Sequence, residues 1–296
     1  MTLVNYFAGI ELGGTKIKCL IASDPDNVAD ECVIPTTNPE ETLPRIIDFV
    51  QNSAQRLSLS LQGAGVSCFG PLDLDPQSST YGWITSTPKK EWRNFPVLQY
   101  IQDHLGIPVR IETDVNGAAL AEGRWGAAVG LSDYVYMTVG TGIGGGVIHN
   151  FTPLIGMSHP EIGHMKIQPH PDDPFQGNCP YHTNCLEGLA NAPSIAARWK
   201  SDPTLLADDH QAWIFEAFYL GQAIHNLILF CAPKKVILGG GVLKRNGLIE
   251  KTRDETLKIL NGYIVSGYLE DMHEYIVPPA LGDRSGALGA IALFLD

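Results

Sequence analysis

The feature that most constrains the fold is a strand, a glycine-rich turn and a second strand, an arrangement that occurs twice. The first copy is "AGIELGGTKIKCLIAS" and the second is "DYVYMTVGTGIGGGVIHN", with a G-x-G-x-x-G at Gly140, Gly142 and Gly145. A dinucleotide site needs such a turn to open directly into a helix whose amides hold the pyrophosphate. Here a strand follows the turn. The pattern therefore excludes a dinucleotide site, and the G-K-[ST] ending of a P-loop is also missing.

As a matched pair, the two hairpins predict a clamp for the phosphates of a nucleotide between two similar domains. Each tip offers backbone N–H groups, and glycine lets a ligand approach the backbone closely. One such hairpin alone is more often only a tight turn. The expected phosphate-binding residues are Gly13, Gly14, Thr15 and Lys16 in the first tip and Gly140, Thr141 and Gly142 in the second.

Composition narrows the possible functions. A chain of 296 residues with 44% apolar content can bury two moderate cores, which favours two domains. Its formal net charge of −12 argues against nucleic acid or an anionic membrane as a partner. There is no signal-peptide pattern and no uninterrupted apolar run of about 18 residues, so we expect a cytoplasmic protein. Six cysteines in a chain of this length do not indicate a disulfide framework.

The rest of the chain alternates strand and helix patterns, which predicts an α/β fold. Asn38 is a good helix N-cap, with Pro39 at the first helical position. The alternation starts again at residue 114, so we place a domain boundary near residue 113. We expect the first strands at 6–12, 17–23, 28–34 and 63–69.

Short motifs occur in order along the chain: "GIELGGTK", "GVSCFGPLD", "IETDVNGAALAE", "VGTGIGGG", "HPEIGH", "CPYHTNCLEG", "LGGGV" and "LGDRSGALGA". Together they resemble the ROK family of sugar kinases, and most closely its bacterial fructokinase branch. The resemblance implies an actin-like, hexokinase-like ATPase fold of two α/β domains with a cleft between them. It also implies that the last helix returns to the first domain. The expected domains are therefore 1–113 plus 283–296, and 114–282. The second includes a loop rich in histidine and cysteine that is expected to bind zinc.

Phosphoryl transfer needs a base aimed at the attacking hydroxyl and a divalent cation beside the phosphates. Asp114 follows the strand "PVRIET" and starts a helix, where an Asp is more often an N-cap. The resemblance makes Asp114 the catalytic base and Asn116 the polar neighbour that orders the loop at the sugar. It places Glu11 where the family usually has Asp, as the residue that holds Mg²⁺ through water. Thr113 replaces the Asn of many glucokinases, which favours fructose over glucose.

A loop rich in histidine and cysteine predicts a structural zinc site. Cys179 and Cys185 lie six residues apart with His182 midway between them, in a segment without helical or strand periodicity. Thiolates and imidazoles in a set of four are typical ligands of tetrahedral Zn²⁺. The resemblance gives His164 as the fourth ligand, and His159 is the alternative.

Zinc in this loop would hold Glu161, His164 and Glu187 together without helical or strand support, and carboxylates accept hydrogen bonds from sugar hydroxyls. The resemblance also makes these three residues sugar ligands. It matches Trp92 to a lid over the sugar, and a core position for this tryptophan is an equal alternative. It further matches Gly239, Gly240 and Gly241 to the turn beside the adenosine, and Asp283 to the acidic residue of the C-terminal motif.

The sequence therefore predicts a kinase that uses ATP and Mg²⁺ to phosphorylate a hexose, with D-fructose and its 6-hydroxyl as the expected acceptor. Mannose and glucose are the alternatives. A sugar-responsive repressor of the same family would carry a DNA-binding region, for which little sequence precedes the first hairpin, and a non-catalytic sugar-binding module would be expected to lack Asp114. The expected partners are ATP and the hexose, without nucleic acid or membrane, and the resemblance suggests a homodimer.

Overall fold

The computed structural model describes residues 4–295 and divides into two compact units. The first contains the chain up to Gly130, the segment Pro153–His159 and the chain from Ala280 onward. The second contains Leu131–Thr152 and Pro160–Pro279. The boundary at residue 130 differs from the one expected at 113, for a reason that lies in the packing of the helix after residue 113.

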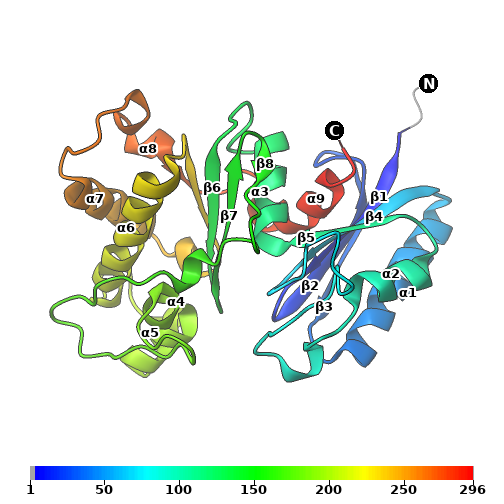
Figure 1. Cartoon of the computed structure of the whole chain (residues 1–296), viewed down its shortest axis with the longest axis horizontal. Helices are drawn as coiled ribbons and strands as arrows, with labels where there is room; N and C mark the ends of the chain where they lie inside the picture. Colours follow the sequence, from blue (N-terminus) through cyan, green and yellow to red (C-terminus); the bar gives the residue numbers. More distant parts are fainter. Residues whose placement is uncertain (1–3, 296) are drawn as a thin grey trace. The chain divides into compact units, whose positions relative to one another are not determined.

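The first unit is built on a five-stranded sheet in the order β3-β2-β1-β4-β5 (Figure 1). β1 pairs antiparallel with β2, which pairs antiparallel with β3, whereas β4 and β5 run parallel to β1. The glycine turn after β1 is therefore a hairpin tip, as predicted. The strands are β1 (Tyr6–Leu12), β2 (Lys16–Ala22), β3 (Val28–Pro35), β4 (Leu61–Cys68) and β5 (Val109–Thr113).

Helix α1 (Pro39–Leu57) packs against β2 and β3, and α2 (Val97–Leu105) packs against β5. The Asn38 side chain caps α1 by accepting a 2.9 Å hydrogen bond from the Glu41 amide, which confirms the predicted helix start. The apolar residues of α1 repeat with helical spacing and bury one stripe of the helix against the sheet. The buried apolar residues of this stripe are Leu43, Ile46, Ile47 and Val50.

Helices α3 (Asp114–Trp125) and α9 (Ser285–Ala292) pack on each other, and α9 also packs on β1 and β4. Glycine makes this approach possible, because a Cβ on Gly65 of β4 would lie only 1.8 Å from the Ala290 carbonyl oxygen. The buried carboxylate of Glu122 in α3 accepts hydrogen bonds from the Leu281 amide and the Ser285 hydroxyl. These contacts place α3 in the first unit and explain why the boundary falls after it.

The second unit repeats the same plan. Its five-stranded sheet has the order β10-β9-β6-β7-β8, with β6 antiparallel to β7 and parallel to β9 (Figure 1). β10 runs parallel to β9. The second glycine turn is thus the tip of the β6–β7 hairpin, in the position that the first turn holds in its own sheet. The strands are β6 (Tyr134–Val139), β7 (Ile143–His149), β8 (Thr152–Pro153), β9 (Val236–Gly239) and β10 (Ile276–Val277).

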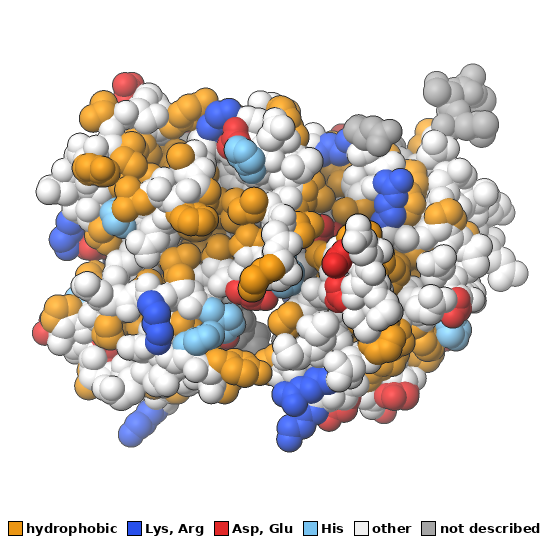
Figure 2. All heavy atoms as spheres, viewed as in Figure 1, with side chains coloured by type: hydrophobic (Ala, Val, Ile, Leu, Met, Phe, Trp, Pro, Cys, Tyr) orange, Lys and Arg blue, Asp and Glu red, His pale blue; other side chains and the backbone are white. Residues whose placement is uncertain are grey.

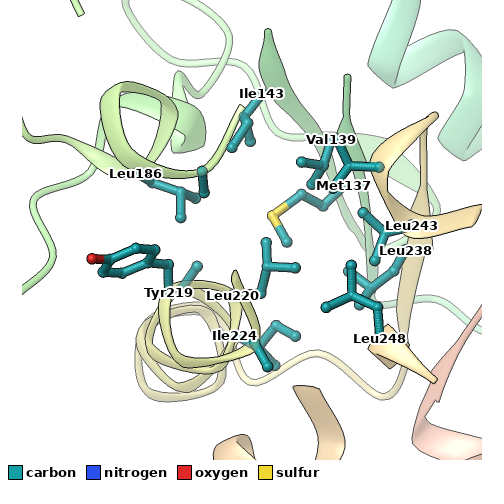
Figure 3. Close-up of a cluster of buried hydrophobic side chains, with 14 of the residues drawn as sticks. Met137, Val139, Ile143, Leu186, Tyr219, Leu220, Ile224, Leu238, Leu243 and Leu248 are labelled. Carbon is teal, nitrogen blue, oxygen red and sulfur yellow. The ribbon is translucent and has the colours of Figure 1, made fainter. Parts of the chain in front are cut away.

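The core of the second unit lies between β6 and the long helix α6 (Ala212–Cys231). Figure 3 shows Met137 and Val139 of β6 facing Leu220 and Ile224 of α6. Among residues 4–295, α6 is the one helix long and apolar enough to cross a membrane, but it is part of this core, and 56% of its most apolar window is buried. The other helices of the unit are α4 (Leu186–Ala190), α5 (Ala192–Trp199), α7 (Leu248–Leu260) and α8 (Met272–Tyr275).

Candidate functional site

The first hairpin tip is held by the residue that follows β3. The Thr36 hydroxyl donates a 2.7 Å hydrogen bond to the Gly13 carbonyl, and the Thr36 amide donates one of 3.0 Å to the Thr15 carbonyl. Gly13 is required by the turn, because a Cβ there would lie 2.6 Å from the Lys16 carbonyl oxygen. The tip is therefore fixed by the sheet of its own unit.

Gly14 is different, because the fold does not require glycine there. Its φ is not positive, and an added Cβ would meet only Lys89 Cε, at 3.5 Å. A small residue at an open hairpin tip is expected where a ligand approaches the backbone. Lys89, which the sequence did not single out, brings a flexible cation to the same tip.

Glu11, at the end of β1, carries an acidic group suited to a hydrated cation. Its Oε2 is buried and has no hydrogen-bond partner among the described residues. Burial raises the pKa of Glu11, while Lys18 and Lys16 oppose the shift. Gly286 of α9 makes room for the side chain, since a Cβ there would lie 2.4 Å from Glu11 Cδ. An orphaned carboxylate oxygen beside the tip expected to bind phosphate fits Mg²⁺, which is usually bound through one or two carboxylates and retained water.

The junction of β5 and α3 positions Asp114. Thr113 is the N-cap of α3, since its hydroxyl accepts a 3.2 Å hydrogen bond from the Asn116 amide. The capping role considered for Asp114 therefore belongs to Thr113. Asp114 occupies the first helical position, where its Oδ1 accepts a 2.9 Å hydrogen bond from the Val115 amide. A carboxylate in the first turn of a helix is stabilised by the helix dipole.

Asn116 is completely buried and donates a 3.0 Å hydrogen bond from Nδ2 to Glu112 Oε1. The same oxygen accepts a 2.8 Å hydrogen bond from the Thr113 amide. Burial raises the pKa of Glu112, and these hydrogen bonds act in the opposite direction. Sequence reasoning missed Glu112, although it lies two residues before Asp114. The structure thus places Asn116 as the side chain that holds Glu112, and its role at the sugar stays a prediction.

The second hairpin tip is held from outside its sheet, by residues that come after the cysteine loop. The Ala192 amide donates a 2.8 Å hydrogen bond to the Gly140 carbonyl, and Asn191 Nδ2 donates one of 3.0 Å to the Thr141 carbonyl. Glu187 Oε2 accepts a 2.9 Å hydrogen bond from the Ile143 amide. The helices α4 and α5, which the sequence did not predict, and Asn191 between them supply all three contacts.

Gly140 and Gly142 have different surroundings. A Cβ on Gly140 would meet nothing within 4 Å, and its φ is not positive, so the fold leaves this position open. A Cβ on Gly142 would lie 3.0 Å from Glu187 Oε2. The tip glycine that contacts a predicted sugar ligand is therefore Gly142, and the one that faces open space is Gly140.

The four predicted zinc ligands come together. Their ligand atoms all lie within 4.8 Å of one another, with Cys185 Sγ 3.5 Å and Cys179 Sγ 3.8 Å from His164 Nδ1, and Cys179 Sγ 3.7 Å from His182 Nδ1. Ligands at about 2.0 to 2.3 Å from a tetrahedral Zn²⁺ lie roughly 3.3 to 3.8 Å from one another. The cluster of His164, Cys179, His182 and Cys185 therefore fits a zinc ion.

His159, the alternative fourth ligand, lies elsewhere. It belongs to the first unit, where it is buried and its Nε2 accepts a 3.5 Å hydrogen bond from the Leu72 amide. The geometry therefore favours His164. Burial raises the pKa of the Cys185 thiol to about 11, so a bound cation is needed to hold it as a thiolate near neutral pH.

Two carboxylates lie beside the cluster. Glu187 follows Cys185 in the first turn of α4, and Cys185 Sγ accepts a 3.4 Å hydrogen bond from the Gly188 amide. Desolvation, and then the charge of Glu187, raise the pKa of Glu161. The charges of Glu161 and Glu187 therefore act on each other, and a ligand that donates hydrogen bonds to both would relieve their repulsion.

In the turn after β9, the fold itself requires two of the three glycines. A Cβ on Gly239 would lie 2.5 Å from the Tyr136 hydroxyl, and Gly240 has a φ of +96° and lies against the Val139 backbone. A Cβ on Gly241 would meet nothing within 4 Å. Of the three predicted residues at this turn, only Gly241 faces open space.

Trp92 is 1% exposed and its Nε1 donates a 2.7 Å hydrogen bond to the Thr37 carbonyl. The core alternative is therefore the one that the structure supports for this tryptophan. Asp283 lies in a short 3₁₀ turn before α9, and its carbonyl accepts a hydrogen bond from Lys18 Nζ.

Comparison with known proteins agrees with this geometry. The model of the ROK family matches residues 7–296. The chain belongs to the ROK family. It is 43% identical to the fructokinase of Zymomonas mobilis, over 98% of this chain and 97% of that protein. It is 38% identical to the fructokinase of Pediococcus pentosaceus, over 96% of each chain.

Among solved structures, the ROK hexokinase from Thermus thermophilus matches with a TM-score of 0.78 and 28% identity, over 97% of each chain. The two α/β units with matching strand orders therefore form an actin-like ATPase fold. The predicted family and fold class are confirmed.

Proposed function

We propose that this ROK protein transfers the γ-phosphoryl group of ATP to a hexose, and that D-fructose is its main acceptor, with fructose 6-phosphate as product. The observation that carries the proposal is the pair of hairpin tips in which the fold does not require glycine at Gly14 or Gly140: an added Cβ would meet only Lys89 Cε, at 3.5 Å, at the first position and nothing within 4 Å at the second. Full-length relatives that are fructokinases, 43% and 38% identical, support fructose as the substrate.

In this reaction the acceptor hydroxyl gives its proton to Asp114 while its oxygen forms a bond to the γ-phosphorus. The bond from that phosphorus to the bridging oxygen breaks, and ADP leaves. Mg²⁺ would neutralise the phosphates, and Glu11 would hold its water shell through the carboxylate oxygen that lacks a protein partner. The backbone amides of both tips would bind phosphate oxygens, and Gly241 would lie beside the adenosine.

The cysteine loop would select the sugar. Zinc on the four-residue cluster would fix the start of α4 and with it Glu187, while His164 and Glu161 would meet the sugar hydroxyls from the same loop. Asn116 would act through its hydrogen bond to Glu112. Thr113 replaces an amide that would contact an aldohexose, which supports fructose over glucose.

The direct test is ADP release with fructose, mannose and glucose in parallel, together with a coupled assay specific for fructose 6-phosphate. The proposal expects the highest kcat/KM with fructose and phosphate on the 6-hydroxyl. A higher kcat/KM with mannose or glucose would replace the substrate but keep the reaction. ADP release with none of the three sugars, from protein that carries zinc and binds ADP, would contradict the reaction itself.

We further propose that the kinase is a cytoplasmic homodimer. Figure 2 shows hydrophobic side chains gathered over the unit that carries α6 and α7. Apolar patches on soluble proteins mark contact surfaces. Light scattering should give twice the chain mass, and Phe230→Asp should lower it to that of a monomer. The large exposed apolar side chains of this unit near the ends of α6 and α7 are Leu229, Phe230, Leu257, Tyr263, Val265 and Tyr268.

A further inference from the structure

Two cysteines face each other in the sheet of the first unit. Cys19 of β2 and Cys32 of β3 are direct partners in the antiparallel register of these strands. Directly opposite residues of antiparallel strands have Cβ atoms about 4.5 to 5.5 Å apart, on the same side of the sheet. Neither cysteine is in a disulfide in this structure.

The two thiols differ in access and in acidity. Cys19 is 1% exposed, whereas Cys32 is only partly buried. The neighbouring Cys19 thiol lowers the pKa of Cys32, while the Cys32 side chain and burial raise the pKa of Cys19. The more accessible sulfur is thus the better nucleophile, and a second sulfur lies within reach of any product formed on it.

The remaining cysteines lack this combination. Cys68 is buried, and burial raises the pKa of its thiol. Cys231, in α6, is partly buried like Cys32, but its Sγ donates to the Leu227 carbonyl and burial raises its pKa. Cys179 and Cys185 belong to the metal cluster. Cys231 therefore offers a matched control for Cys32.

We propose that Cys19 and Cys32 form a redox-sensitive dithiol, which hydrogen peroxide oxidises to a disulfide that links β2 and β3. The Cys32 thiolate attacks one peroxide oxygen, the O–O bond breaks, and hydroxide leaves and takes up a proton as water, with sulfenic acid on Cys32. The Cys19 sulfur then attacks the Cys32 sulfur, the Sγ–Sγ bond forms, and hydroxide leaves with the Cys19 proton as a second water. The two thiols lose two electrons, which reduce the peroxide.

The disulfide would act on the first hairpin tip through the strands that carry it. β2 begins at Lys16, in the tip itself, and Thr36, directly after β3, holds the Gly13 and Thr15 carbonyls. A disulfide brings Cβ atoms to about 3.5 to 4.5 Å, closer than most opposed pairs of strands allow. Oxidation therefore pulls β2 and β3 together and shifts the tip. This effect on nucleotide binding rests on the proposed function, whereas the formation of the disulfide does not.

The experiment treats the zinc-loaded full-length protein with hydrogen peroxide, blocks the remaining thiols with N-ethylmaleimide in denaturant and maps the peptides by mass spectrometry. We expect a Cys19–Cys32 disulfide to form before Cys231 is modified, and dithiothreitol to reverse it. The KM for ATP should rise roughly threefold or more on oxidation, with less change in the KM for fructose. Cys32→Ser should form no disulfide, and its KM for ATP should not respond to peroxide. Cys231→Ser should behave like the wild type in both respects.

Mapping decides the proposal even if Cys32→Ser folds poorly, because it is done on the wild-type chain. The proposal is overturned if Cys19 and Cys32 both react with N-ethylmaleimide in denaturant after a peroxide treatment that has modified Cys231. It is also overturned if Cys32→Ser, with an unchanged melting temperature, loses activity to peroxide as the wild type does. If the disulfide forms without any change in the KM for ATP, the redox-sensitive dithiol is supported, but its proposed effect on the hairpin tip is overturned. Failure of the proposed function would appear separately, as absence of kinase activity before oxidation.

Discussion

The two glycine hairpins have the same topology, but different parts of the molecule hold their tips. Thr36, directly after β3, holds the first tip, so this tip depends on its own sheet. Glu187, Asn191 and Ala192 hold the second tip, and all three come directly after the cysteine loop. A change in that loop should therefore reach the second tip and leave the first unchanged.

The two tips also differ in charge. Lys16 and Lys89 accompany the first tip, together with the buried carboxylate of Glu11. The Glu187 carboxylate contacts the second tip through the Ile143 amide. The duplicated framework thus carries two kinds of site. The first hairpin is suited to phosphate and a cation, and the second, if it binds phosphate as proposed, would link phosphate binding to the loop expected to bind the sugar.

The largest effect should come from the group that has no counterpart in the second unit. Asp114 follows β5, whereas Pro278 follows β10, the corresponding strand. Asp114→Asn should lower kcat by about a hundredfold or more, the usual range for a positioned base. Steady-state kinetics and ADP titration should show this loss with nucleotide affinity retained. The exposed Asp103→Asn is the control. Activity of Asp114→Asn within about threefold of the wild type would exclude Asp114 as the base.

Loss of the metal should disturb the second tip more than the first. Cys179→Ser should leave both sheets folded but release Glu187, so that the KM for fructose rises roughly tenfold or more, an effect common for lost metal-site contacts. Nucleotide affinity should fall less, because the first tip is held independently. Elemental analysis should give one zinc per wild-type chain, and Cys231→Ser should keep it. Protein without stoichiometric zinc, whose melting and sugar KM are unchanged by chelation, would show that the metal assignment is wrong.

Within the first hairpin, one glycine serves packing and another faces open space. A Cβ on Gly9 would lie 2.3 Å from the Ala287 carbonyl oxygen of α9. Gly9→Ala should therefore cost about 1 to 3 kcal/mol of stability, as overpacking does. Gly14→Ala should change stability little, because only the end of the Lys89 side chain is near. Urea denaturation compares the two variants. Equal destabilisation would mean that both glycines are structural.

The smallest effect concerns Glu11 and pH. Because its pKa is raised in the folded protein, the folded state holds this proton more tightly than the unfolded chain. Its destabilising effect is absent below about pH 4 and grows as pH rises through the raised pKa. Ligand-free Glu11→Gln should therefore melt higher than the wild type at neutral pH but not under acid conditions, and its activity should fall. The exposed Glu270→Gln should change neither property. An equal or lower melting temperature for Glu11→Gln at neutral pH would contradict the cost of burial.

Signals within a few residues of sequence made several parts of the fold and of the candidate site predictable. Asn38 and Pro39 define the start of α1, and the two glycine turns define the hairpins, because each signal lies within a few residues. The zinc cluster was also readable, since three of its four ligands lie within seven residues of sequence. The sequence left both His164 and His159 as candidates for the fourth zinc ligand. The structure favours His164, because His159 belongs to the other unit.

What the sequence did not reveal depends on long-range packing. Glu122 ties α3 to the start of α9 across more than 150 residues of chain, so the domain boundary could not be read at residue 113. Trp92 is equally compatible with a lid and a core until its partner Thr37 is known. The short helices α4 and α5 are too brief to show a helical period, yet they hold the second tip.

The central claim is that both tips bind one nucleotide, and ADP titration of Gly14→Val and Gly140→Val in the presence of Mg²⁺ tests it most directly. A Cβ would meet only the flexible end of Lys89 at Gly14 and nothing within 4 Å at Gly140, so each variant should keep the wild-type melting temperature. The account predicts that each variant binds ADP with a Kd roughly tenfold higher, about 1.4 kcal/mol weaker, and leaves the KM for fructose unchanged. Wild-type ADP affinity in either variant would show that its tip does not bind phosphate, and would contradict the clamp.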